Sequence, residues 1–230
     1  MSGNIDIRLE DLVSNPTPRV AVAVCADTSG SMAGEPIDEL NRGIRTFFDD
    51  IKRDETALYA CEISFVSFGG NAPALERDYS GIDLAPEPPV FRASGRTPMG
   101  EAVMMALDML ERRKKEYQDA GVDYYQPWLV LLSDGHPNGD PDVLKQAMDR
   151  TARMVNSGKL TVFPIAIGYE ASMEVLSRFS PKRPPLRLQG LKFRELFEWL
   201  SKSVARTSQS MPGEVVKLDY EGIKSWAELS

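Results

Sequence analysis

Residues 20–31, VAVAVCADTSGS, decide the fold, because they join a valine-rich apolar run to a polar loop. A continuous apolar run of this kind is typical of a parallel strand that is buried on both faces. The same succession of apolar run, polar loop and amphipathic helix recurs along the chain. It predicts an α/β domain with a doubly wound, mainly parallel central sheet, helices on both faces and one antiparallel edge strand.

Hydrophobic periodicity places the remaining elements. Further strands are predicted at residues 61–68, 74–78, 128–132, 160–167 and 214–218. Helices are predicted at about residues 36–51, 98–116, 141–154, 172–179 and 193–207. Thr97 and Asp140 each precede a proline and are predicted to be helix N-caps. Pro164 lacks a donor for the sheet, so its strand is expected near an edge or locally irregular.

The chain is predicted to form a single domain. It has 230 residues, and it shows no internal repeat, low-complexity tract or clear linker. We expect one domain over residues 1–230, with a core at about residues 18–207. A short segment precedes this core, and a C-terminal extension covers residues 208–230.

Composition excludes several classes of protein. The net charge of −7 argues against a general nucleic-acid binder, which needs a basic surface to meet phosphates. No apolar run approaches the roughly 18 residues of a membrane span, and the polar N-terminus lacks the pattern of a signal peptide. We therefore expect a cytoplasmic protein without a membrane anchor. Cys25 and Cys61 lie in apolar stretches and are expected to be reduced core cysteines.

Three polar loops are candidates for a binding site, because ligands bind beyond the carboxyl ends of parallel strands. They follow the first strand, precede the helix near residue 98, and follow the strand at 128–132. Each loop alone also fits a cap or a turn, but their shared chemistry favours a site. Together they supply two carboxylates and three hydroxyls, all oxygen ligands of the kind that hard cations prefer: Asp27, Ser29, Ser31, Thr97 and Asp134.

These residues carry a resemblance to a known family. The sequence resembles von Willebrand factor type A domains that have a metal-ion-dependent adhesion site. The family motif DxSxS matches residues 27–31, its threonine matches Thr97 in a TPMG context, and its aspartate matches Asp134 in an SDG context. The stretches at 106–117, 121–135 and 191–204 are similar to the bacterial TerY-like branch, which is associated with tellurite resistance.

The resemblance implies a metal-dependent interaction module and no enzyme activity. Three hydroxyls would approach Mg²⁺, or Mn²⁺ or Ca²⁺, while the two aspartates would bind it directly or through water. An ion held mainly by neutral ligands favours an anionic sixth ligand, such as an Asp or Glu of a protein partner. Candidate positions for partner contacts are the loops around Gly30, Met32, Gly95 and His136.

The TerY-like branch also implies a cellular setting. Its members resemble components of bacterial stress-response systems and occur in a triad with a protein kinase and a PPM-type serine/threonine phosphatase. Such a kinase and phosphatase are therefore the protein partners that the resemblance implies.

Three other functions remain open from the residues. A serine hydrolase would pair Ser29 or Ser31 with His136, but no G-x-S-x-G elbow is present. A metal-dependent phosphohydrolase would use the same cation, although no catalytic base stands out and no P-loop motif occurs. A structural module would use the cation solely to stabilise the loops.

Overall fold

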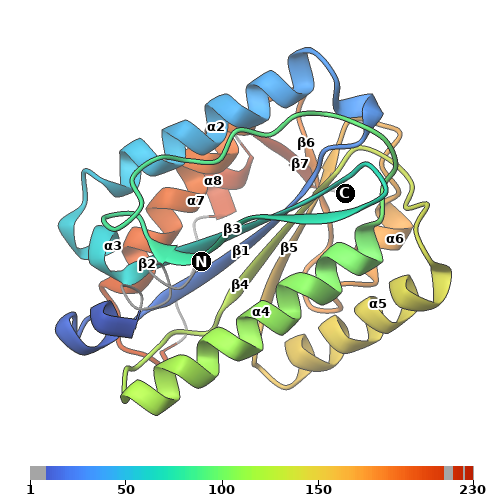
Figure 1. Ribbon diagram of the computed structural model, residues 1–230. Coiled ribbons are helices and arrows are strands. Elements are labelled where there is room, and N and C mark those ends of the chain that lie inside the picture. The colour runs from blue at the N-terminus through green and yellow to red at the C-terminus, as the bar shows by residue number, and fades with distance from the viewer. Residues whose placement is uncertain (1–8, 215–219, 225, 230) are drawn as a thin grey trace.

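The computed structural model describes residues 9–214, 220–224 and 226–229, and they form one mainly parallel sheet (Figure 1). The strands are β1 Val20–Asp27, β2 Cys61–Gly69, β3 Ala72–Gly81, β4 Trp128–Ser133, β5 Thr161–Ile167, β6 Leu186–Leu188 and β7 Ala227–Leu229. Their order in the sheet is β3-β2-β1-β4-β5-β6-β7. The pairs among β2, β1, β4, β5 and β6 are parallel, whereas β3 and β7 are antiparallel to their neighbours.

Helices cover both faces of this sheet, as Figure 1 shows. They are the short 3₁₀ helix η1 Gly30–Met32, α2 Glu35–Ile51, α3 Glu55–Ala60, α4 Met99–Ala120, α5 Pro141–Asn156, α6 Met173–Ser177, α7 Phe193–Ser208 and α8 Tyr220–Ile223. One face carries α2 and α7, and the other carries α4 and α5. The predicted doubly wound α/β fold is confirmed.

The alternation of side chains along β1 explains why both faces are apolar. Val20, Val22 and Val24 pack into the core beneath α2 and α7. Ala21 and Cys25 point to the opposite face and pack beneath α4. Since β1 lies in the middle of the sheet, both sides of the strand are covered, and the whole run is buried. Both cysteines are buried and free, as expected.

The edges of the sheet differ in part from the prediction. The expected antiparallel edge strand is β3, and β7 adds a second one at the opposite edge. Pro164 lies in β5, which is not an edge strand. The pairing of β6 with β5 begins one residue later, at Ile165, so the proline, which has no N–H group, precedes that pairing. The strand predicted at 214–218 falls outside the described residues except at Glu214, which lies in a bend.

The two predicted helix caps have different outcomes. The carboxylate of Asp140 accepts hydrogen bonds from the backbone N–H groups of Asp142 at 2.8 Å and Val143 at 3.3 Å, so this cap is confirmed. The Thr97 cap is wrong, because α4 begins at Met99 and Pro98 is its N-cap residue. Thr97 lies one residue too early, and a neighbouring loop binds its backbone instead.

The amino-terminal ends of the strands enclose an ionic cluster. Glu62 on β2 accepts two hydrogen bonds from the guanidinium of Arg113 on α4, both at 2.7 Å. It also accepts hydrogen bonds from Arg19 at 3.2 Å and from the hydroxyl of Tyr117 at 2.7 Å. All four side chains are buried, so the cluster fixes α4 against β1 and β2.

Candidate metal centre

The predicted site lies where the sheet changes its winding direction. The chain runs from β1 to β2 on one side, whereas β4 pairs with β1 on its other side. Loops at such a switch point diverge to opposite faces and leave a crevice at the carboxyl ends of the strands. Asp27 is the last residue of β1, and Asp134 directly follows β4, so both carboxylates lie at this crevice.

Asp27 is fully buried and held by two hydrogen bonds. Its Oδ1 accepts the backbone N–H of Ser29 at 2.9 Å, and its Oδ2 accepts the hydroxyl of Ser133 at 2.8 Å. Burial raises the pKa of Asp27 to about 6, and the nearby charge of Asp134 adds to the rise, while the hydrogen bonds oppose it. The buried carboxylate is therefore oriented by the protein but lacks a countercharge among the described residues.

The hydroxyls of Ser29 and Ser31 lie side by side, with their Oγ atoms 3.1 Å apart. Two neighbouring ligands of an octahedral Mg²⁺ ion, each about 2.0–2.1 Å from the metal, are about 2.9 Å apart. Ser29 is buried and Ser31 is exposed, so the pair extends from the core to the surface. This spacing fits a hard divalent cation.

Thr97 is buried and is tied to both other loops through its backbone neighbourhood. The backbone N–H of Gly30 donates to the carbonyl of Gly95 at 3.1 Å. The N–H of Thr97 donates to Oδ1 of Asn138 at 2.7 Å, and the N–H of Asn138 donates back to the Thr97 carbonyl at 3.1 Å. The structure thus brings the three loops together, with Thr97 between them.

Glycines allow these backbones to approach closely. Gly95 has a φ of +67°, and a Cβ atom at this position would lie 2.4 Å from the Cα of Gly70. A Cβ at Gly69 would lie 2.4 Å from the carbonyl oxygen of Thr28. Gly69 and Gly70 are not among the site positions that were predicted from the sequence. The sequence feature that could have pointed to them is a pair of glycines directly after the strand predicted at residues 61–68.

Asp134 supplies the clearest sign of a missing ligand. Its Oδ1 is enclosed and has no hydrogen-bond partner in the described part of the chain. An enclosed carboxylate oxygen without a partner costs free energy, because it has lost water and gained nothing in exchange. A divalent cation bound between Asp134 and the serine hydroxyls would supply the missing partner. The residues present therefore fit such an ion.

The donor set also indicates the class of metal. Within residues 9–214, 220–224 and 226–229, no group of three or more His, Cys, Asp or Glu side chains could hold a metal. The predicted set instead combines two carboxylates with three hydroxyls, which suits Mg²⁺, Mn²⁺ or Ca²⁺ and disfavours Zn²⁺. The assignment of the five ligands stays a prediction.

The predicted contact positions around the site differ in exposure. Gly30, Gly95 and His136 are exposed, whereas Met32 is fully buried in the core beneath α2. Among the described contacts, His136 makes no hydrogen bond to Ser29, which a serine nucleophile activated by histidine requires. Among the described residues, Ser29 and His136 therefore do not form the hydrogen-bonded pair that a serine hydrolase uses.

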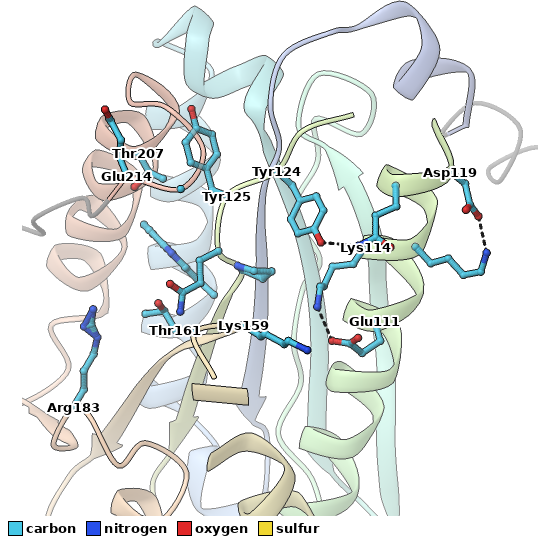
Figure 2. A pocket seen from close by; sticks show the side chains of 17 residues that line it. Glu111, Lys114, Asp119, Tyr124, Tyr125, Lys159, Thr161, Arg183, Thr207 and Glu214 are labelled. Carbon is cyan, nitrogen blue, oxygen red and sulfur yellow. Dashed lines mark hydrogen bonds and ion pairs between the residues drawn. The ribbon is translucent and has the colours of Figure 1, made fainter. Parts of the chain in front are cut away.

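A hollow of about 1000 Å³ lies at the end of the sheet opposite to the candidate metal centre (Figure 2). Its wall includes the last turns of α4 and the starts of β4 and β5. Lys114 pairs with Glu111 at 2.9 Å, and Lys115 pairs with Asp119 at 2.8 Å. Two of the lysines that line this hollow are thus paired with acidic side chains of the same helix.

The described residues contain no helix that combines the length and the apolar character needed to cross a bilayer.

Comparison with known proteins gives distant relatives. No family model matches the chain. Inter-alpha-trypsin inhibitor heavy chain H4 from Sus scrofa is 26% identical over 160 residues, which cover 67% of this chain and 16% of that protein. The chain therefore spans a small part of that relative.

Solved structures share the architecture at low sequence identity. A von Willebrand factor type A protein from Catenulispora acidiphila has a TM-score of 0.59 and 13% identity, covering 82% of this chain and 43% of that one. The vWF domain of the pili tip protein Mfa5 from Porphyromonas gingivalis has a TM-score of 0.58 and 12% identity, covering 87% and 99%. The pilus adhesin SpaC from Lactobacillus rhamnosus GG has a TM-score of 0.63 and 12% identity, covering 83% and 31%. These likenesses establish that the chain has the fold of von Willebrand factor type A domains.

Proposed function

We propose that this chain is a non-enzymatic protein-interaction module that binds an acidic residue of its partner through a divalent cation. The single observation that carries the proposal is the enclosed Oδ1 of Asp134, which has no hydrogen-bond partner in the described part of the chain and lies close enough to Asp27 for its charge to raise the pKa of Asp27. In this proposal Asp27, Ser29, Ser31, Thr97 and Asp134 hold Mg²⁺, or Mn²⁺ or Ca²⁺. The bound ion supplies an electrophilic centre for a carboxylate.

The charges of the site support binding of an anion. Both carboxylate oxygens of Asp27 already accept hydrogen bonds from the protein, which reduces their donation to a cation. The hydroxyl ligands are neutral, so they leave most of the positive charge of the ion uncompensated. A carboxylate from a partner is the ligand that completes such a charge distribution.

The same site offers little for catalysis. His136 is exposed and makes no described hydrogen bond to the serine hydroxyls. The carboxylate of Asp27 is fixed between Ser29 and Ser133, where it orients a loop and does not face an open pocket as a base. A metal-dependent phosphohydrolase and a purely structural metal are therefore the alternatives that the experiments must separate.

The cellular setting is also part of the proposal. On the resemblance to the TerY-like branch, we propose that the module acts in a bacterial stress response of the tellurite-resistance type, in the cytoplasm. A protein kinase and a PPM-type serine/threonine phosphatase are the proposed partners. The chain covers 16% of inter-alpha-trypsin inhibitor heavy chain H4, so the proposal takes no activity from that protein.

Direct metal binding is the first test. Isothermal titration with Mn²⁺ and Mg²⁺ should show binding to the wild type and at least about tenfold weaker binding to Asp134→Asn, since a carboxylate ligand is lost. Asp142→Asn removes an equal charge from an exposed position at the start of α5 and serves as the matched control. Equal binding by wild type and Asp134→Asn would refute the proposed site.

Partner dependence is the second test. The purified wild type is incubated with host lysate in Mg²⁺ or in EDTA, next to Asp134→Asn and the Asp142→Asn control. Proteins retained by wild type and control in Mg²⁺, and lost in the other two samples, support metal-dependent recognition. Identical retention in all samples favours a structural metal. A separate assay follows the hydrolysis of p-nitrophenyl phosphate, and Mg²⁺-dependent hydrolysis that is lost in Asp134→Asn favours the phosphohydrolase.

A further inference from the structure

A polar pocket of about 290 Å³ lies directly beside the candidate metal centre. Its wall combines the residue after the Gly69-Gly70 turn, the residues flanking Thr97, and the loop that leads into α5. The lining residues that matter here are Asn71, Arg96, Glu101, Asn138 and Asp140.

The pocket shares a wall with the metal centre. Asn138 lines the pocket and forms two hydrogen bonds with the backbone of Thr97, at 2.7 and 3.1 Å. Arg96 and Pro98, the neighbours of Thr97 in the chain, line it as well. A ligand bound at the metal would therefore have this pocket next to it.

Glu101 lines this pocket, and one of its two carboxylate oxygens has no hydrogen-bond partner in the described part of the chain. Its Oε1 accepts the backbone N–H of Asp140 at 2.8 Å. Its Oε2 is enclosed and has no hydrogen-bond partner among the residues that the structure describes. The carboxylate lies against Gly139, where a Cβ atom would come within 2.5 Å of Oε2.

The nearest cation of the chain does not neutralise Glu101. Arg96 also lines the pocket, but its guanidinium donates to the carbonyl of Asn138 at 2.9 Å. No ion pair joins Arg96 to Glu101 in the described part of the chain. Asp140 adds a second negative charge, and its Oδ1 caps α5. The pocket thus carries two carboxylates against one guanidinium.

These features fit an organic cation. A carboxylate oxygen removed from water is stabilised by a charged donor, and a lysine ammonium or an arginine guanidinium provides one. A second metal ion fits less well, because the described residues contain no group of three or more acidic, histidine or cysteine side chains for a metal. The complement of this pocket is a basic side chain.

We infer that the partner segment carries a lysine or arginine close to the acidic residue that binds the metal, and that Glu101 binds this cation. The inference rests on the proposed function, because the acidic residue sets the register of the partner. One residue of extended chain spans about 3.3–3.6 Å, so a pocket adjoining Thr97 is reached within about three positions. Glu101 is then the residue that selects among acidic partners.

Selection of random peptides displayed on phage tests the inference without a known partner. Phage are bound to the wild type in Mg²⁺ and eluted with EDTA. We expect an enriched acidic residue with a basic residue at a fixed distance from it. In Glu101→Gln the amide oxygen still accepts the N–H of Asp140, so the loop is kept. This variant should enrich the acidic residue alone, and the Asp142→Asn control should behave as the wild type.

One enriched peptide is then synthesised with its basic residue intact or replaced by alanine. The replacement should weaken binding to the wild type by about fivefold or more, and to Glu101→Gln by less than about twofold. Enrichment of acidic residues without a basic one by the wild type overturns the inference and leaves the proposed function standing. The inference is also overturned if the peptides enriched by Asp142→Asn lack the basic residue as completely as those enriched by Glu101→Gln. Absence of EDTA-eluted acidic peptides overturns the proposed function itself.

Discussion

Asp27 is stabilised poorly in the metal-free fold, because burial raises its pKa from 3.8 to about 6. The folded state then binds the proton more tightly than the unfolded state, so stability decreases as the pH rises from about 4 to about 6. The difference of about 2 pKa units corresponds to roughly 3 kcal/mol at neutral pH. The residue that orients the site thus lowers the stability of the empty protein.

We predict that Asp27→Asn melts at a higher temperature than the wild type in EDTA at pH 7.5. The amide oxygen can accept from Ser29, and the amide N–H can donate to the Ser133 hydroxyl, so both contacts persist. The difference should shrink as the pH falls below about 4, where the wild-type carboxyl is protonated in both states. Thermal melts across this pH range check the prediction, and a lower melting temperature for the variant at pH 7.5 would contradict it.

At this scale the sequence named the candidate ligands but not their surroundings. Asp27 and Asp134 were found because each directly follows an apolar run, and such loops meet at one edge of a parallel sheet. The supporting role of Asn138 was invisible, because its contact with Thr97 joins residues 41 positions apart. The unsatisfied oxygen of Asp134 likewise depends on packing that no local pattern encodes.

At the scale of the elements, the loop that carries Thr97 is positioned by the backbone crossing at Gly95. We predict that Gly95→Ala weakens Mn²⁺ binding and destabilises the protein by more than about 1–2 kcal/mol. The reason is that the new Cβ meets the backbone of Gly70 in addition to the strain of a positive φ. Titration with Mn²⁺ and urea denaturation measure the two effects.

Gly121→Ala is the matched control for this variant. Gly121 ends α4 with nearly the same φ of +68°, but a Cβ atom there has no neighbour within 4 Å. It should lose about 1–2 kcal/mol from backbone strain and keep normal Mn²⁺ binding. Equal metal affinity for the Gly95 variant and this control would show that the crossing does not position the site.

The ionic cluster around Glu62, at the amino-terminal ends of the strands, is expected to stabilise the fold. Arg113→Leu should destabilise the protein by about 3–5 kcal/mol, since it removes one of the two arginines that neutralise the buried Glu62. Arg194→Ala breaks the exposed pair with Glu198 and should cost less than about 1 kcal/mol. Urea denaturation of both variants tests this, and similar losses would argue against the cluster as a structural anchor.

Long and buried elements were predicted from the sequence better than short ones. The long helices and the apolar strands were placed well, because periodicity over many residues is a strong signal. The strands β6 and β7 were missed, because each has three residues and owes its conformation to pairing with a distant neighbour. The Thr97 cap was wrong since Asn138, a tertiary contact, outcompeted local helix capping.

At the scale of the whole molecule, the proposed function implies that metal binding and folding are linked. A cation that binds the folded state alone, at a free concentration 100 times its Kd, adds about 2.7 kcal/mol to the free energy of unfolding. For a domain of this size we expect Mg²⁺ to raise the melting temperature by roughly 5–11 °C. Calorimetry of the wild type with Mg²⁺ or EDTA measures the shift, and Asp134→Asn, with at least about tenfold weaker binding, should show at most about half of it. A similar shift in that variant would place the ion elsewhere.

The outer strand β3 has a consequence for behaviour at high concentration. It is ten residues long, and within the described part of the chain one row of its backbone groups has no strand partner. Unprotected strands of this length can recruit a second copy and begin amyloid-like stacking. In β3, Pro73 withholds an amide proton, and Glu76, Arg77 and Asp78 place three consecutive charged residues in the strand. Colloidal stability of the chain is thereby built into the rim of its sheet.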